Sequence, residues 1–173
     1  MRLSLLHPSR SRIDKSIKTT QKWMSQIGDV DVELIVSCDI DDPQSAEYQS
    51  YYMGGNSDTL LISHNKSAVD AINAAAKIAT GDVLIVLSDD TDCPRNWASQ
   101  IEYEMRDKVD RVLKVDDGIQ DWIVTMPVVH RRYYERFGYI YHPGYSHMFC
   151  DTEFTHVANC LKKVSKCALE FPQ

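Results

Sequence analysis

Short apolar runs and amphipathic stretches alternate along the first hundred residues of the chain. The apolar runs predict buried strands, because they are short and are bounded by turn-forming or charged residues. The predicted strands are Arg2–Leu6, Asp31–Cys38, Thr59–Ser63 and Val83–Leu87. Apolar residues at helical spacing predict the helices Asp14–Ile27, Ser67–Ala79 and Asn96–Arg106, and Glu47–Gly55 favours a short or irregular helical segment. This alternation favours a doubly wound α/β sheet with right-handed crossovers.

The pattern is less regular after Lys108, although no linker, repeat or low-complexity tract interrupts it. We expect two more strands, the second broken by Pro127, and then a short helix, an aromatic loop and a terminal helix. These elements are Arg111–Val115, Trp122–Val129, His130–Phe137, Gly138–Tyr145 and Cys150–Lys166. The whole chain, residues 1–173, is therefore expected to form a single compact domain.

A cluster of acids follows the most apolar of the predicted strands, Val83–Leu87. Asp89, Asp90 and Asp92 lie within four residues of one another, where their charges repel. A bound Mg2+ or Mn2+ would relieve this repulsion, because both ions prefer hard oxygen ligands. The alternative is a solvated acidic turn in which Asp92 or Asn96 caps the next helix.

The second predicted strand also ends in acids, in the segment CDIDD that contains Asp39 and Asp41. In an open α/β sheet, ligands bind beyond the carboxyl ends of the strands. Two acidic strand ends therefore favour a ligand or metal site over a chance cluster.

Composition and charge narrow the classes of protein and partner. A formal net charge of −6 argues against a general nucleic-acid binder, which needs a basic face. The chain has no apolar run long enough to span a bilayer and no signal-peptide core at its N-terminus. Its five cysteines form an odd set without CxxC spacing, which favours reduced thiols and a cytoplasmic location over disulfides or structural zinc.

Four motifs stand in the order HPSRSR, CDIDD, NKSAVDAINAAAKIATGDVLIVL and SDDTDCPRNW. This order resembles the nucleotide-sugar-binding half of a family 2 glycosyltransferase with the GT-A fold, over about the first hundred residues. The resemblance implies a GT-A-like fold, with a Rossmann-type mixed sheet flanked by helices. Residues 1–107 would bind the nucleotide sugar, and residues 108–173 would form an abbreviated acceptor side. The nucleotide-sugar-binding residues that it implies are Pro8, Ser9, Arg10, Asp39, Asp41, Asn65, Lys66 and Asp89.

The family's metal-binding motif is Asp-x-Asp, and alignment on Trp97 places Ser88, Asp89 and Asp90 at its three positions. The resemblance implies that Asp90 binds Mn2+ or Mg2+, and that Asp89 contacts the ribose or a metal-bound water. Serine replaces the first acid, which is a departure from the family pattern. His156 is a further candidate to reach the metal or a phosphate, and Asp90-Thr91-Asp92 is a second formal match to the motif.

The family's catalytic base is an acid at the start of a late helix, on the acceptor side. In the segment FCDTEFTHV, Asp151 is the first candidate for this base and Glu153 the second. The alternative is that Asp151 caps the helix and Glu153 is a solvated surface residue. His142 and His147 are weaker candidates, in a loop whose tyrosines offer a stacking surface for a sugar ring.

The resemblance implies a metal-dependent, inverting transfer of a sugar from a nucleotide sugar, with a UDP-sugar favoured, to an unidentified hydroxyl acceptor. The alternative is a non-catalytic GT-A-like domain that binds a nucleotide or a partner within a larger assembly. A nucleotidyltransferase ranks last, because HPSRSR lacks the glycine that such a phosphate-binding loop needs. We expect neither a nucleic-acid partner nor a transmembrane segment, and the sequence leaves the oligomeric state open.

Overall fold

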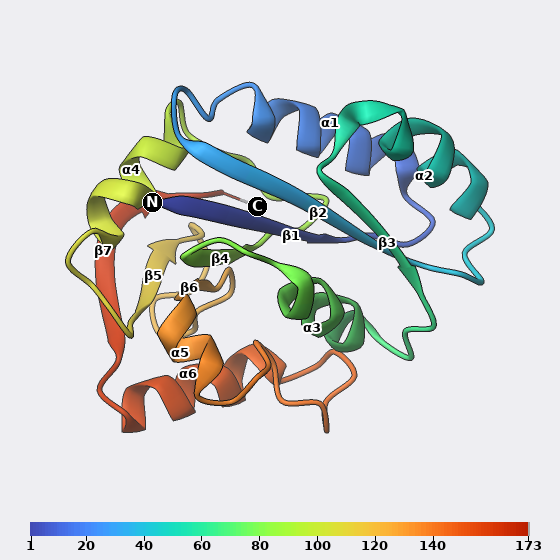
Figure 1. The fold of residues 1–173 in the computed structure, drawn as a ribbon. Coiled ribbons are helices and arrows are strands. Elements are labelled where there is room, and N and C mark those ends of the chain that lie inside the picture. Colours follow the sequence, from blue (N-terminus) through green and yellow to red (C-terminus); the bar gives the residue numbers. More distant parts are fainter. Residues whose placement is uncertain (173) are drawn as a thin grey trace.

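A single seven-stranded mixed sheet forms the centre of the computed structural model (Figure 1). Its strands, in the order β3-β2-β1-β4-β6-β5-β7, are β3 (Thr59–Ser63), β2 (Asp31–Asp39), β1 (Arg2–Pro8), β4 (Val83–Val86), β6 (Val128–His130), β5 (Val112–Asp116) and β7 (Val164–Glu170). The first four in this order run parallel, and β6 is antiparallel to both of its neighbours. The structure describes residues 1–172, so Gln173, the last residue of the predicted domain, lies outside it.

Helices cover both faces of the sheet, with α1 and α2 on one side and α3, α5 and α6 on the other (Figure 1). The central strands are apolar on both faces because they are buried on both. Along β1, Leu3 and Leu5 pack in one core cluster and Leu6 packs in the other. The helical elements are α1 (Ile13–Met24), α2 (Ser45–Tyr51), the π-helical turn η1 (Tyr52–Asn56), α3 (Ala68–Ile78), α4 (Trp97–Met105), α5 (Arg131–Glu135) and α6 (Cys150–Cys160).

Two tryptophans fix the acidic segment after β4 against α1. The Trp23 and Trp97 rings lie 4.8 Å apart, and the Trp97 indole N–H donates to the Trp23 carbonyl. The Trp23 indole N–H in turn donates to the Thr91 carbonyl. Both rings are fully buried, so these hydrogen bonds hold the segment in place without competition from water.

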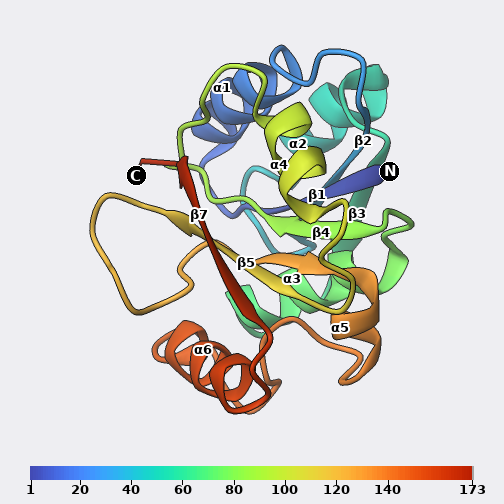
Figure 2. The ribbon, with the colours of Figure 1, turned by 90° about the vertical axis from the view of Figure 1, so that its left-hand side faces the viewer.

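The terminal helix predicted for Cys150–Lys166 is wrong beyond Cys160. Lys162 adopts a left-handed conformation, with a φ of 55°, and this ends the helical path. The chain then reverses into β7, which pairs in parallel with β5 at the edge of the sheet. Figure 2 looks onto this edge and shows β7 crossing in front. Alternate exposure along β7 fits an edge strand that has one face on the core.

The strand predicted for Trp122–Val129 is also wrong in extent, because only Val128–His130 joins the sheet. The residues before it form a loop around the buried Asp117. The Asp117 carboxylate accepts from the backbone N–H groups of Ile119 and Gln120 and from the Thr125 hydroxyl. These local bonds satisfy backbone groups that would otherwise need a neighbouring strand.

The remaining predicted elements are confirmed to within a few residues at their ends, although the predicted helix His130–Phe137 shortens to Arg131–Glu135. Among the described residues, none of the helices combines the length and apolar character that crossing a bilayer requires.

Candidate functional site

A cavity of about 950 Å3 opens at the carboxyl ends of β1, β2 and β4. Strands that run parallel present their last residues at the same edge of the sheet, so segments far apart in sequence meet there. The cavity gathers most of the sequence-predicted site residues, namely Pro8, Ser9, Arg10, Asp39, Asp41, Asn65, Lys66, Asp89 and Asp151.

One end of the cavity is a charged cluster built from the turn after β1 and the end of β2. Nη1 of Arg10 lies 2.5 Å from Oδ2 of Asp39 and 2.7 Å from Oδ1 of Asp41. Nδ2 of Asn65 donates to the other Asp39 oxygen at 2.7 Å. Hydrogen bonds to Asp41 and Asp39 raise the pKa of Arg10, and the Arg10 guanidinium lowers the pKa of Asp41. The cluster therefore favours the ionised form of Asp41 and presents a polar, hydrogen-bonding wall.

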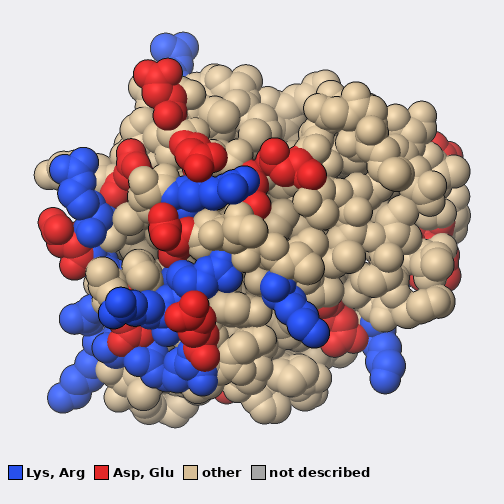
Figure 3. Space-filling view, in the orientation of Figure 1, with Lys and Arg blue, Asp and Glu red and all other residues tan. Residues whose placement is uncertain are grey.

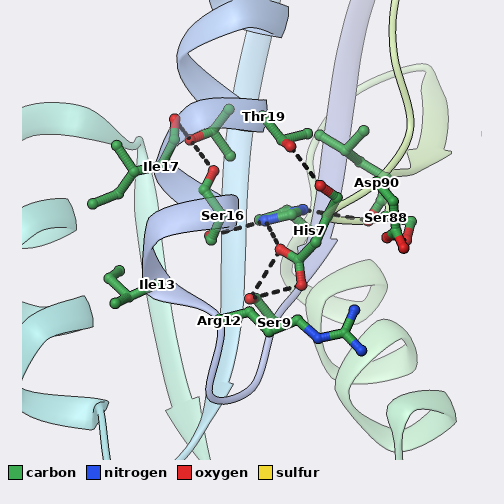
Figure 4. A network of polar contacts seen from close by, with 12 residues as sticks. His7, Ser9, Arg12, Ile13, Ser16, Ile17, Thr19, Ser88 and Asp90 are labelled. Atoms are coloured by element: carbon green, nitrogen blue, oxygen red, sulfur yellow. Dashed lines mark hydrogen bonds and ion pairs between the residues drawn. The ribbon is translucent and has the colours of Figure 1, made fainter. Parts of the chain in front are cut away.

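Asp89 is a buried carboxylate at the floor of the cavity. Oγ of Ser9 donates to both of its oxygens, at 3.0 and 3.2 Å, and Nε2 of His7 lies 3.1 Å from Oδ1. Figure 4 shows His7 and Ser9 close together below α1, with Ser88 and Asp90 to their right. The Ser9 hydroxyl also pairs with the Tyr48 hydroxyl at 2.6 Å, and burial raises the pKa of Tyr48 to about 12.

Helix α1 completes this network from the other side. Oγ of Ser16 lies 2.9 Å from Nε2 of His7 and 2.7 Å from the Tyr52 hydroxyl. The Thr19 hydroxyl donates to the backbone carbonyl of Asp89 at 2.7 Å. Both the side chain and the backbone of Asp89 are thereby tied to β1 and α1, which fixes the orientation of the residues on either side of it.

Asp90 lies beside the cavity, faces solvent and is not one of the residues that line the cavity. It is exposed, and its Oδ1 accepts from Oγ of Ser88 at 2.8 Å. Ser88 itself lines the cavity. Asp92 instead pairs with Lys22 of α1, whose hydrogen bond lowers the pKa of Asp92. At the start of α4, Asn96 makes no side-chain capping bond among the described residues, and Asp92 accepts from the nearby Cys93 N–H.

The first turn of α6 supplies the opposite wall. Asp151 lines the cavity, and its Oδ1 accepts from the N–H of Thr152 at 2.7 Å. Phe149, not Asp151, occupies the N-cap position. Glu153 and His156 lie further along α6 and are not among the lining residues, and Nε2 of His156 lies 3.6 Å from Sγ of Cys160. The roles predicted for Asp90, Glu153 and His156 stay predictions.

The cavity also has lining residues that the sequence did not single out. Thr125 comes from the loop around Asp117, and Met148 and Phe149 come from the segment before α6. Met148 and Phe149 are about two-thirds exposed, at 66% and 65%. Two exposed apolar side chains next to a carboxylate were a weak signal in the sequence, since either is unremarkable alone.

Glycosyltransferases are among the solved structures similar to this chain. S. aureus TarS, residues 1–349, is 15% identical with a TM-score of 0.73, over 99% of this chain and 60% of that chain. Mannosyltransferase PcManGT from Pyrobaculum calidifontis, in complex with GDP-Man and Mn2+, is 12% identical with a TM-score of 0.76, over 99% of this chain and 56% of that chain. A Drosophila β-1,4-galactosyltransferase 7 mutant, in complex with manganese, UDP-Gal and xylobiose, is 14% identical with a TM-score of 0.66, over 95% of this chain and 64% of that chain.

No known family profile and no curated protein matches the sequence. The chain spans less than two thirds of the length of the solved chains named above. At this level of identity the similarity establishes the fold, and it confirms the predicted GT-A-like architecture of a mixed sheet flanked by helices.

Proposed function

We propose that this chain transfers a sugar from a nucleoside diphosphate sugar to an acceptor hydroxyl. The observation that carries the proposal is the single cavity that has the Arg10 cluster at one end and Asp151 at the other. Similar structures support it, because TarS has been solved with UDP and with UDP-GlcNAc, and PcManGT with GDP-Man. We favour a UDP-sugar as the donor.

The donor is held by residues 1–107 and the acceptor by residues 108–173 in this proposal. Arg10, Asp39, Asp41 and Asn65 form a wall of charged and amide groups that suits the base and ribose of a nucleotide. Lys66, also in the cavity wall, offers a cation to the diphosphate. Pro8 ends β1 and Ser9 begins the turn that places Arg10, and Asp89 anchors that turn through Ser9.

We propose that Asp90 holds a divalent cation, Mn2+ or Mg2+. Within residues 1–172, no group of three or more histidine, cysteine or carboxylate side chains is spaced to hold a metal ion. A single carboxylate nevertheless fits Mg2+, which commonly takes one or two carboxylates and completes its shell with substrate phosphates and water. Asp90 is exposed next to the cavity, and the adjoining Ser88 hydroxyl is a second oxygen donor. When bound, such an ion neutralises charge on the leaving diphosphate.

Asp151 is the proposed general base. Its carboxylate accepts the proton of the acceptor hydroxyl as that oxygen attacks the anomeric carbon, and the bond to the diphosphate breaks. Attack from the side opposite the leaving group inverts the anomeric centre. Glu153 is the second candidate for the base and His156 a further candidate metal ligand. Both are weaker because they lie on α6 away from the cavity wall.

Calorimetric titration of UDP and GDP, each with and without Mn2+, is the first test of the donor site. We expect one nucleotide to bind, and to bind more tightly with Mn2+. Failure of both nucleotides to bind under either condition would contradict the donor-site proposal. Binding of one nucleotide that Mn2+ leaves unchanged would contradict the metal proposal alone.

Two substitutions separate metal binding from catalysis. Asp90→Asn should remove the effect of Mn2+ on nucleotide affinity, whereas Asp151→Asn should leave affinity intact and lower the transfer rate by about 100-fold or more. Glu47→Gln, an exposed acid on α2, serves as the control for Asp90. If Glu153→Gln abolished transfer while Asp151→Asn retained it, the base would be Glu153.

A non-catalytic nucleotide-binding domain is the second candidate function. It is favoured by Ser88, which stands where the similar motif has its first acid. Nucleotide binding without hydrolysis or transfer of any UDP-sugar or GDP-sugar would support this alternative.

A further inference from the structure

A group of Lys and Arg side chains gathers at the end of the sheet opposite the cavity, where β5 and β7 begin. The amino ends of β5 and β7 meet there, next to α5, and the space-filling view shows the cations at its lower left (Figure 3). We call this surface the basic face, and its residues are Arg111, Arg132, Arg136, Lys162 and Lys163. Strand β1 runs from this end of the sheet toward the cavity. The basic face and the cavity therefore lie at opposite ends of the strands and face in different directions.

Asp110 organises the basic face. Its two oxygens accept from Nη1 and Nη2 of Arg136, at 2.7 and 2.9 Å, and Nζ of Lys163 lies 2.5 Å from Oδ2. Nη1 of Arg111 donates to the backbone carbonyl of Lys162 at 2.6 Å. These contacts clamp the segments before β5 and before β7 together, so the face is a built surface rather than a chance cluster of mobile chains.

The basic face carries more positive charge than its own acids neutralise. Arg111, Arg132 and Lys162 form no salt bridge with any described residue, and Arg132 and Lys162 are exposed. Besides Asp110, the exposed Glu135 of α5 is the acid between Arg132 and Arg136 on that helix. On a chain with a net charge of −6, an unbalanced group of five cations departs from the overall charge. Their mutual repulsion falls when an anionic surface meets them.

Apolar side chains accompany these cations. Val109 is 49% exposed next to Asp110, and Leu161 is 39% exposed next to Lys162. Cations interspersed with exposed apolar side chains suit the boundary between lipid headgroups and acyl chains. There the cations pair with anionic headgroups and the apolar side chains contact the acyl chains. A partner bound only through its charges, such as the phosphate backbone of a nucleic acid, would make no apolar contact with Val109 and Leu161.

We propose that the basic face binds the surface of an anionic membrane. Arg111, Arg132 and Lys162 contact lipid headgroups, and Val109 and Leu161 enter the interface. The cavity, at the opposite end of the sheet, then stays open to water and to its substrates. This inference concerns a different surface from the proposed transfer reaction and does not depend on it.

Co-sedimentation with lipid vesicles tests the proposal directly. Vesicles of phosphatidylcholine with phosphatidylserine should carry the protein down, pure phosphatidylcholine vesicles should not, and high salt should weaken the binding. The double variant Arg132→Glu/Lys162→Glu should bind the anionic vesicles at least about 25-fold more weakly, because each basic residue contributes on the order of fivefold.

The matched control is Lys15→Glu/Lys18→Glu, which makes the same change in net charge on the exposed side of α1. It should bind the anionic vesicles like the unaltered chain, and circular dichroism should show both double variants folded. An equal loss of vesicle binding in the two double variants would mean that only the net charge matters, and it would overturn the proposal. Failure to bind anionic vesicles would also overturn it, including the case in which an acidic peptide or polyphosphate binds the basic face instead.

Discussion

Glu33 and Asp89 are two buried carboxylates of the central sheet, and they have different partners. Glu33, near the start of β2, accepts from the backbone N–H groups of Thr80 and Gly81 and from the Ser4 hydroxyl. Asp89, beyond the end of β4, is held by Ser9 and faces His7. Glu33 of β2 thus joins β1 to the turn before β4, at the end of the sheet away from the cavity, whereas Asp89 fixes the cavity floor.

Replacing Glu33 isolates the contribution of these hydrogen bonds. In Glu33→Gln the amide keeps one acceptor oxygen, but it loses the charge and turns two donors toward groups that themselves donate. We expect the free energy of unfolding to fall by about 1–3 kcal/mol, measured by urea denaturation. Glu47→Gln, at an exposed position, should change it by less than about 0.5 kcal/mol. Equal stability of the two variants would contradict the role given to Glu33.

At the scale of elements, the end of β7 closes the side of the core that contains the tryptophans. Phe171 follows β7, is 1% exposed and stacks on Trp23 with ring centroids 5.4 Å apart. The N–H of Phe171 donates to the Asp116 carbonyl, and the Pro172 carbonyl accepts from the N–H of Asp92. The segment after β7, a strand whose first three residues the sequence predicted as helix, therefore also ties down the acidic segment beside the cavity.

Phe171→Ala should destabilise the chain by about 3–5 kcal/mol, because it leaves a cavity against Trp23 in a fully packed cluster. The control is Tyr103→Ala, since Tyr103 is 71% exposed on α4. Chemical denaturation followed by tryptophan fluorescence measures both variants. A loss in Phe171→Ala no larger than in Tyr103→Ala would show that β7 does not need this anchor.

For the molecule as a whole, several carboxyls make stability depend on pH. Burial acts to raise the pKa of Glu33, but its hydrogen bonds outweigh burial and lower it overall. Hydrogen bonds from Arg136 lower the pKa of Asp110, and those to Asp117 outweigh its burial. A lowered pKa means that the folded chain holds its protons less tightly than the unfolded chain, so this stability is present at neutral pH and is lost in acid.

We therefore expect the free energy of unfolding to fall as the pH drops below about 4.5 and to keep falling toward the lowered pKa values. The slope of this acid limb should be shallower in Glu33→Gln, since one of the contributing carboxyls is gone. Denaturation across a pH series checks this. An acid limb of the same slope in the variant would mean that Glu33 titrates alike in the folded and unfolded chains.

The sequence predicted the architecture and the position of the cavity, because both follow from local patterns. Apolar runs ending in acids mark strands and their carboxyl ends, and parallel strands bring those ends together. The orientations of neighbouring acidic side chains could not be predicted from these local patterns. Asp89 and Asp90 are adjacent in sequence, yet one is buried on His7 and the other is exposed, because β1 and α1 supply distant partners. β7 was not predicted because an edge strand forms by pairing with its neighbour in the sheet. That neighbour is β5, which lies about fifty residues earlier in the sequence.

The place of β1 in the sheet has a consequence for the newly made chain. Of the seven strands in this sheet β1 is synthesised before the others, yet it lies inside the sheet, where Leu3 pairs with Val83 and Leu6 with Val86. One edge of this apolar strand stays without its partner until β4 has been made, and such distant pairings form slowly. An unpaired apolar edge is a template for another chain. A strand that is buried inside the finished sheet is thus open to aggregation while the chain is being made.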